Sequence, residues 1–137
     1  MEIAPFLEAD RLIFMKQSAW LEFEKRDDYE IIDLGRPFVF LVPVGKLQIK
    51  IGKNTVEERL KKFLESKFAA FTKNPNIRGY WKGQIDDLVE YEASFLGKEQ
   101  IPSLLKMLAN LSEKIGEKCF YIKAGQYTAL IQKRRKR

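Results

Sequence analysis

The sequence of 137 residues contains no histidine and a single cysteine, and these two shortages exclude much of the usual catalytic chemistry. Zinc sites of the Cys/His type cannot be built, nor can Ser-His-Asp or Cys-His nucleophiles. Cys119 alone cannot form an internal disulfide, which favours an intracellular setting, and we expect a cytoplasmic protein. Any acid–base chemistry falls to Glu, Asp, Lys, Tyr or Cys.

Long apolar runs and ligand-binding motifs are lacking as well. No apolar run approaches the roughly 20 residues that a membrane helix needs. The opening MEIAPFLEADR has no basic stretch before an apolar core, so we expect neither a secretory signal nor a membrane contact. No EF-hand spacing is present. Gly79-x-x-x-Gly83 is not followed by Lys-Ser/Thr and opens no helix, and we therefore predict neither a metal nor a cofactor.

What the sequence does contain is an uneven distribution of charge. The net charge is +6, with 25 basic and 19 acidic residues. Residues 1–34 carry nine acids and four bases, residues 35–132 are basic overall, and residues 133–137 are all basic. With 45% hydrophobic and 12% aromatic residues, the composition is typical of one globular domain.

Local patterns from residue 44 onward predict an alternation of strands and helices. Residues 45–51 alternate with period two and predict a strand. The capping box from Thr55 to Glu58 begins an amphipathic helix that we expect to reach about Phe71. Strands are predicted at 77–81 and 88–96, with Asp86 and Asp87 near their turn. A helix is predicted at about 100–115, a strand at 118–123 and an extended segment at 127–132.

This order predicts an α+β fold with a ferredoxin-like βαββαβ core over residues 44–132, a four-stranded antiparallel sheet with both helices on one face. Residues 1–43 would form an N-terminal extension packed on the core, and 133–137 a flexible basic tail. Within the extension, residues 5–26 fit either one helix, which we favour, or two strands. Residues 30–34 and 38–42 resemble strands.

Two glutamates are the candidate catalytic groups. In the strand 88–96, Glu90 and Glu92 alternate onto the face away from the helices. Lys46, Gln48, Lys50 and Tyr121 are expected on the same face. A polar cleft with two carboxylates could raise the pKa of one of them and make it a base, with Tyr121 as hydrogen-bond donor. The structural alternative is cross-strand Glu–Lys pairing on a solvated sheet.

Basic residues form the second candidate site. Tyr80 and Trp81 lie close in sequence to two of the basic residues, Arg78 and Lys82. One of the two aromatic side chains should face inward, because adjacent residues of a strand point to opposite faces. Such a patch suits phosphate groups, although the aromatic RNA-binding pattern is missing. The residues assigned to this binding site are Arg59, Lys61, Lys62, Arg78, Lys82, Lys133, Arg134, Arg135, Lys136 and Arg137.

We therefore expect binding rather than catalysis. The leading hypothesis is a small non-catalytic binding or regulatory protein that forms a homo-oligomer and meets a polyanionic partner, such as a nucleic acid, through the basic helix and tail. The alternative is a histidine-free enzyme or small-ligand binder that uses Glu90 and Glu92 in a cleft between subunits.

Overall fold

The computed structural model describes residues 28–125 and 127–134, without the side chains of 127–130. The chain divides into two compact units, Met1–Gly35 and Arg36–Arg137. In the first unit, the described residues 28–35 form neither helix nor strand, so the strand expected at 30–34 is absent. Gly35 N donates to Asp33 Oδ1 at 2.8 Å. The segment 5–26 lies outside the described residues.

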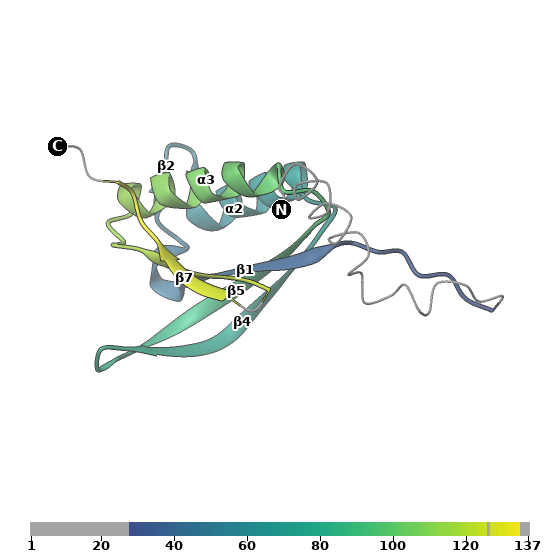
Figure 1. Ribbon diagram of the computed structural model, residues 1–137. Coiled ribbons are helices and arrows are strands. Elements are labelled where there is room, and N and C mark those ends of the chain that lie inside the picture. The colour runs from purple at the N-terminus through teal and green to yellow at the C-terminus, as the bar shows by residue number, and fades with distance from the viewer. Residues whose placement is uncertain (1–27, 126, 135–137) are drawn as a thin grey trace, which may run out of the picture. The chain divides into compact units, whose positions relative to one another are not determined.

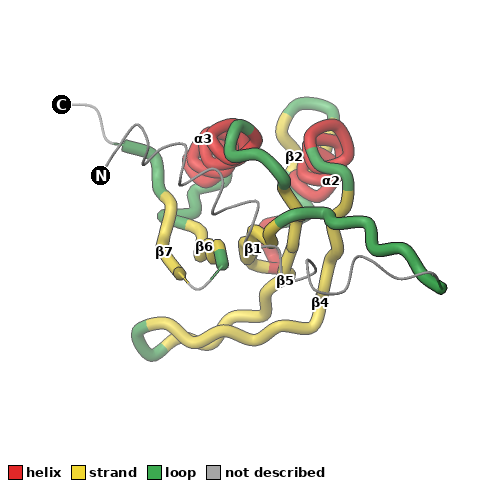
Figure 2. The backbone as a smooth tube through the Cα atoms, turned by 45° about the vertical axis from the view of Figure 1, so that its right-hand side comes forward, coloured by secondary structure: helices red, strands yellow, loops and turns green. Residues whose placement is uncertain are grey.

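The second unit is an α+β structure in which helices cover one face of an antiparallel sheet (Figures 1 and 2). The described part of the chain forms a five-stranded sheet in the order β4-β5-β1-β6-β7, in which all neighbouring strands are antiparallel. The strands are β1 (Arg36–Pro43), β4 (Ala70–Trp81), β5 (Gln84–Phe95), β6 (Phe120–Ala124) and β7 (Tyr127–Ile131). The covering helices are α2 (Val56–Lys67) and α3 (Gln100–Lys114). The predicted α+β class, with an antiparallel sheet and two helices, is confirmed.

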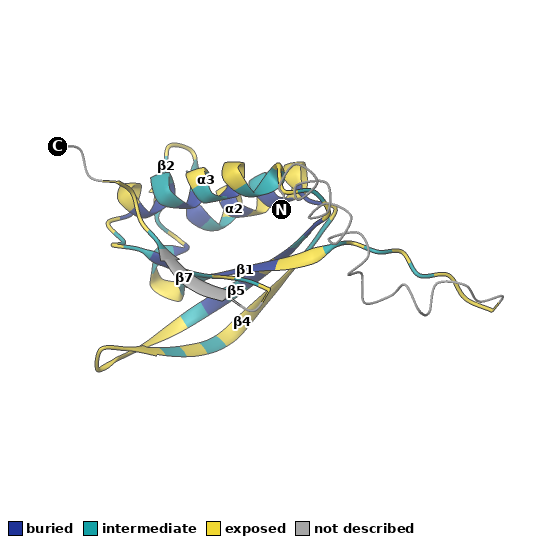
Figure 3. Cartoon of the chain, in the orientation of Figure 1, coloured by how far each residue is buried: buried dark blue, intermediate teal, exposed yellow. Residues whose placement is uncertain are grey.

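The central strand β1 carries apolar side chains on both faces. Phe38, Phe40 and Val42 are buried under the helices. Phe40 stacks on Tyr91 of β5, with ring centroids 5.1 Å apart and an interplanar angle of 11°. Val39 and Leu41 alternate onto the other face of the sheet. A strand that is apolar on both sides is typical of the middle of a sheet, and Figure 3 shows burial concentrated between this strand and the helices.

The strand expected at 45–51 is the main error of the sequence-based fold. Residues Val44–Lys46 form a short 3₁₀ helix (η2), and only Lys50–Ile51 (β2) is extended, paired with Asn54–Thr55 (β3). Leu47 is nonetheless buried, and its carbonyl accepts from Glu57 N at 3.0 Å. The alternating apolar residues thus serve a turn that leads into α2, and β1 occupies the place in the sheet.

Local signals located the helices and the hairpin more accurately. The capping box of α2 is confirmed, with Glu58 N donating to Thr55 Oγ1 at 3.1 Å and Thr55 N donating to Glu58 Oε1 at 2.8 Å. The helix ends at Lys67, earlier than expected, because β4 begins at Ala70. Strand β4 absorbs Pro75 at a register shift between Asn74 and Ile77.

The β4–β5 hairpin is longer than the sequence predicted. A two-residue turn joins the strands, and both of its residues have positive φ, 49° at Lys82 and 85° at Gly83. This geometry is the tight turn that matches the twist of an antiparallel pair. Asp86 and Asp87, expected near the turn, therefore lie within β5. The hairpin extends beyond the other strands, away from the helices (Figure 1).

Candidate functional site

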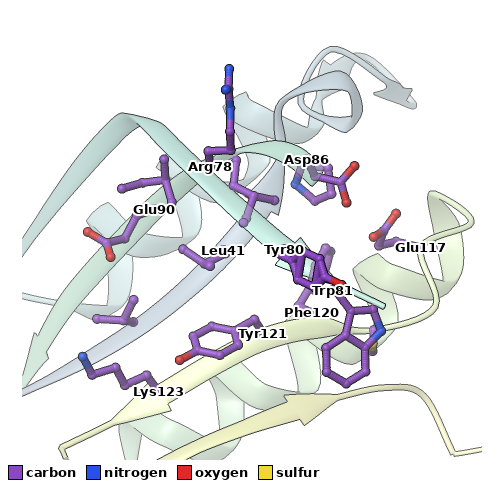
Figure 4. Close-up of a pocket in the computed structure, with 16 residues that line it drawn as sticks. Leu41, Arg78, Tyr80, Trp81, Asp86, Glu90, Glu117, Phe120, Tyr121 and Lys123 are labelled. Atoms are coloured by element: carbon purple, nitrogen blue, oxygen red, sulfur yellow. The ribbon is translucent and has the colours of Figure 1, made fainter. Parts of the chain in front are cut away.

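A cleft of about 610 Å³ lies on the sheet face that the helices do not cover. Its floor is apolar and consists mainly of Val39, Leu41 and Leu88, from the central strands β1 and β5. One wall is the tip of the β4–β5 hairpin, and the opposite wall is the segment 117–123, which includes the loop after α3 and most of β6 (Figure 4). The volume lies in the range of small-molecule sites.

The hairpin tip supplies aromatic side chains to the cleft. Tyr80 and Trp81 both line it and are 71% and 59% exposed. The expectation that one of the two faces inward is wrong, because the tip extends past the helices and no other described residues cover either of its faces. Gly79 leaves room for the Leu88 side chain, since a Cβ at position 79 would lie 2.6 Å from Leu88 Cδ1.

Two carboxylates meet at one end of the cleft. Asp86 comes from the hairpin wall and Glu117 from the loop that follows α3 (Figure 4). Burial raises the pKa of Glu117 above its usual 4.5, and the negative charge of Asp86 raises it further, while Lys46 opposes both effects. A carboxyl with a raised pKa beside a second acid in a cleft is a candidate for proton transfer.

Backbone contacts fix the loop that presents Glu117. Glu117 N donates to the carbonyl of Ser112 at 2.8 Å, across a turn in which Gly116 has φ 71°. Lys46 Nζ donates to the carbonyl of Ile115 at 3.2 Å. These bonds satisfy carbonyls at the C-terminus of α3, as in a glycine-terminated helix. Sequence reasoning missed Glu117 because its relation to Asp86 exists only in the folded chain.

The predicted glutamates are separated by this geometry. Glu90 lines the cleft, in a row with Leu41 and Tyr121 across the strands. Glu92 lies on the same face but does not line the cleft; its row contains Val39 and Lys123. Within the described residues, neither glutamate forms an ion pair. The expected pairing with Lys46 and Lys50 cannot form, because those lysines lie outside the five-stranded sheet.

The tyrosines of the two faces also have different roles. Tyr121 lines the cleft and is partly exposed, as expected for a hydrogen-bond donor. Tyr91 points to the helix face, is 2% exposed, and burial raises its pKa to about 12. Tyr91 therefore belongs to the core and cannot serve the cleft.

The predicted basic residues do not form one surface. Arg59, Lys61 and Lys62 lie on α2, whereas Arg78 and Lys82 lie on the hairpin, which extends from the sheet on the side away from the helices (Figure 1). Arg59 donates to the carbonyl of Ile51 at 3.0 Å, and Lys61 pairs with Glu65 at 3.4 Å. The role of these residues in binding stays a prediction.

The remaining bases of this set are tied to local partners or lie at the chain end. Arg78 Nε pairs with Asp87 at 3.3 Å, and Lys82 lies 5.5 Å from the ring centroid of Trp81. Lys133 donates to Asn110, and Arg134 is exposed. Arg135, Lys136 and Arg137 lie outside the described residues.

The part of the chain that the structure describes contains neither a cluster of metal ligands nor a membrane-spanning helix. In residues 28–125 and 127–134, no group of three or more His, Cys, Asp or Glu side chains is placed to hold a metal ion. Within the same residues, no helix has the length and apolar character needed to cross a membrane.

Comparison with known proteins finds a distant structural neighbour. No known protein family matches the chain, and no curated protein matches its sequence. A solved structure that resembles it is that of a phage SAM lyase in complex with S-methyl-5′-thioadenosine, with a TM-score of 0.45 and 15% sequence identity. The match covers 77% of this chain and 95% of the neighbour.

This neighbour corrects the predicted function. The sequence led us to expect a small non-catalytic binding or regulatory protein with a polyanionic partner. The non-catalytic part of this prediction is corrected, since the solved neighbour is an enzyme, whereas the polyanionic partner stays a prediction. The reaction and the ligand of the neighbour are properties of that protein.

Proposed function

We propose that the chain is an enzyme that holds a small molecule with a flat aromatic part in this cleft, and that Glu117 transfers a proton to or from it. The observation that carries the proposal is the cleft itself, in which aromatic side chains and a pair of acids converge over an apolar floor. Tyr80, Trp81 and Tyr121 offer ring faces and edges to a flat ligand. Val39 and Leu41 offer apolar contact beneath it.

Acid–base work by Glu117 is supported by its surroundings. Its raised pKa keeps the proton available closer to neutral pH than in an ordinary glutamate, which suits a general acid or base. Asp86, on the other wall, lies close enough to influence this proton. Tyr121 keeps the role of hydrogen-bond donor from the enzyme hypothesis that the sequence raised. Glu90, a candidate base in that hypothesis, becomes an auxiliary carboxylate.

The scaffold of this site is proposed to be the ferredoxin-like core. Four of the strands, in the order β6-β1-β5-β4, with α2 and α3 between them in sequence, support that topology. Strand β7 is then an addition at the β6 edge. Homo-oligomerisation and a cytoplasmic setting also stay proposals; the exposed apolar side chains of Tyr80 and Ile85 at the hairpin tip support the former.

The first experiment asks whether the cleft binds small molecules at all. The full chain would be screened by NMR against a library of flat aromatic compounds, both neutral and charged. We expect binders to shift the indole signal of Trp81, which a Trp81→Phe variant distinguishes from that of the second tryptophan, Trp20. A screen whose binders all leave that signal unchanged would reject the cleft as the site.

The second step tests catalysis. Each binder would be incubated with the protein and its products followed by mass spectrometry over a range of pH. Turnover should change across the pH range in which Glu117 titrates, and Glu117→Gln should abolish turnover without unfolding the protein. Glu113→Gln is the matched control, because Glu113 is an exposed carboxylate on α3 that does not line the cleft. Equal turnover in the two variants would remove Glu117 from the mechanism.

A further inference from the structure

We propose that the ligand of this cleft is an organic cation, in which a positively charged nitrogen attached to the flat ring lies between Asp86 and Glu117. The inference rests on the proposed function and adds the charge of the substrate to it. It follows from which charges face the cleft, which of them already have partners, and what the aromatic walls can accept.

The acidic end of the cleft contains no ion pair among the described residues. Asp86 and Glu117 lie on opposite walls, and within the described residues neither is in an ion pair (Figure 4). Lys46 is near enough to lower the pKa of Glu117, but it does not line the cleft, and its ammonium donates to the carbonyl of Ile115. Two carboxylates facing each other without a counterion favour either a proton or a cation between them.

Of the two bases that line the cleft, one is paired with another residue and the other lies far from Asp86 and Glu117. Arg78 pairs with Asp87, which is not a lining residue, and its side chain points away from Asp86 and Glu117 in Figure 4. Lys123 lies at the opposite end of the cleft, near Glu90 (Figure 4). An anionic ligand placed at the Asp86–Glu117 end would meet like charges, which disfavours that class.

The aromatic wall favours the same sign of charge. Ring faces of tryptophan and tyrosine attract cations, most strongly in the case of tryptophan. Lys82 lies 5.5 Å from the Trp81 ring centroid, which shows that this wall accommodates a positive charge. A ligand that combines a flat ring with a positive charge would use both the aromatic wall and the acidic end.

A matched pair of probes tests the inference. Quinoline and N-methylquinolinium are flat bicyclic rings that differ in a fixed positive charge, and at neutral pH quinoline is uncharged. Calorimetry on the full chain should give binding of the cation about tenfold tighter than of quinoline. The preference should weaken with added salt, because the acids are partly exposed.

Variants attribute the preference to the two acids. Asp86→Asn combined with Glu117→Gln should bring the two affinities within about twofold of each other, while Glu113→Gln leaves the preference intact. Lowering the pH through the titration range of Glu117 should weaken cation binding in the wild type, because the proton competes with the cation. Circular dichroism spectra of the variants would verify that they are folded.

The outcomes separate this inference from the proposed function. Equal or tighter binding of quinoline, with Trp81 responding, would overturn the cationic ligand and leave the small-molecule cleft standing. A cation preference that survives the double variant would also overturn the inference, because the charge would be recognised elsewhere. If neither probe binds, the inference is rejected. The library screen then tests separately whether the cleft binds small molecules.

Discussion

Replacing Phe40 by alanine tests the placement of β1 at the centre of the sheet. The Phe40 side chain is 0% exposed and stacks on Tyr91 in the core. Removing a fully buried phenylalanine costs about 3–5 kcal/mol of unfolding free energy, which includes the cavity that is left. The total free energy of unfolding of such a domain is about 5–15 kcal/mol, so the variant should lose a large part of its stability.

The assay is urea denaturation followed by circular dichroism, and its control is the next residue along the strand. Leu41→Ala removes a half-buried side chain on the cleft face and should cost clearly less. If β1 were part of a peripheral extension, as the sequence suggested, Phe40→Ala would act like a surface change, within about 0.5 kcal/mol. A loss below about 1 kcal/mol would therefore refute the central position of Phe40.

Two further predictions concern the capping box of α2 and the turn of the hairpin. Thr55→Ala should cost about 1 kcal/mol of unfolding free energy in urea titrations. An unchanged stability would contradict the cap. Hydrogen bonds with Thr55 lower the pKa of Glu58, so its contribution is present above the pKa of the unfolded chain and lost as the pH falls through the folded value. Glu58→Gln should accordingly lower stability at neutral pH but not in acid. Gly83→Ala should reduce hydrogen-exchange protection at the hairpin tip by about 1–2 kcal/mol, since φ at Gly83 is 85°. Gly45→Ala is the control and should not reduce it, because Gly45 has no positive φ and an added Cβ would contact no other atom. Equal protection in the two variants would contradict the turn.

Features set by neighbouring residues were predictable from the sequence. The capping box, the amphipathic stripes of α2 and α3 and the glycine after α3 locate these helices to within a few residues. Each signal depends on contacts three or four residues apart, which the order of the residues already contains. The α+β class follows from the same local patterns.

Residues 38–42 were expected to be a strand, but the central place of this strand in the sheet was missed, because its pattern is ambiguous. Residues 36–43 are apolar on both faces, and such a run fits any buried segment, whereas the alternating residues 45–51 match a half-buried strand. The alternating pattern of residues 45–51 therefore led to the wrong strand, although Leu47 is in fact buried in a turn. What decides between the two segments is pairing with β5 and β6, which come much later in the chain.

The candidate site was predictable only in part, for the same reason. Glu90 and Tyr121 were found because alternation along a strand assigns a face. Asp86 and Glu117 were not, because the first was assigned to a turn and the second follows a helix with no motif around it. Their proximity depends on how the hairpin tip and the α3–β6 loop approach each other across the sheet (Figure 4).

Strand β1 connects the stability of the domain with the shape of the cleft. Phe38, Phe40 and Val42 fill the core, while Val39 and Leu41, which alternate with them, form the cleft floor. Because the two sets share one backbone, a core substitution that shifts β1 also displaces the floor beneath the ligand. The hairpin tip differs from β1, because its exposed side chains do not pack in the core. Changes at the tip should therefore alter binding with little effect on global stability, whereas changes in β1 should alter both, and this contrast allows the proposed site to be examined independently of folding.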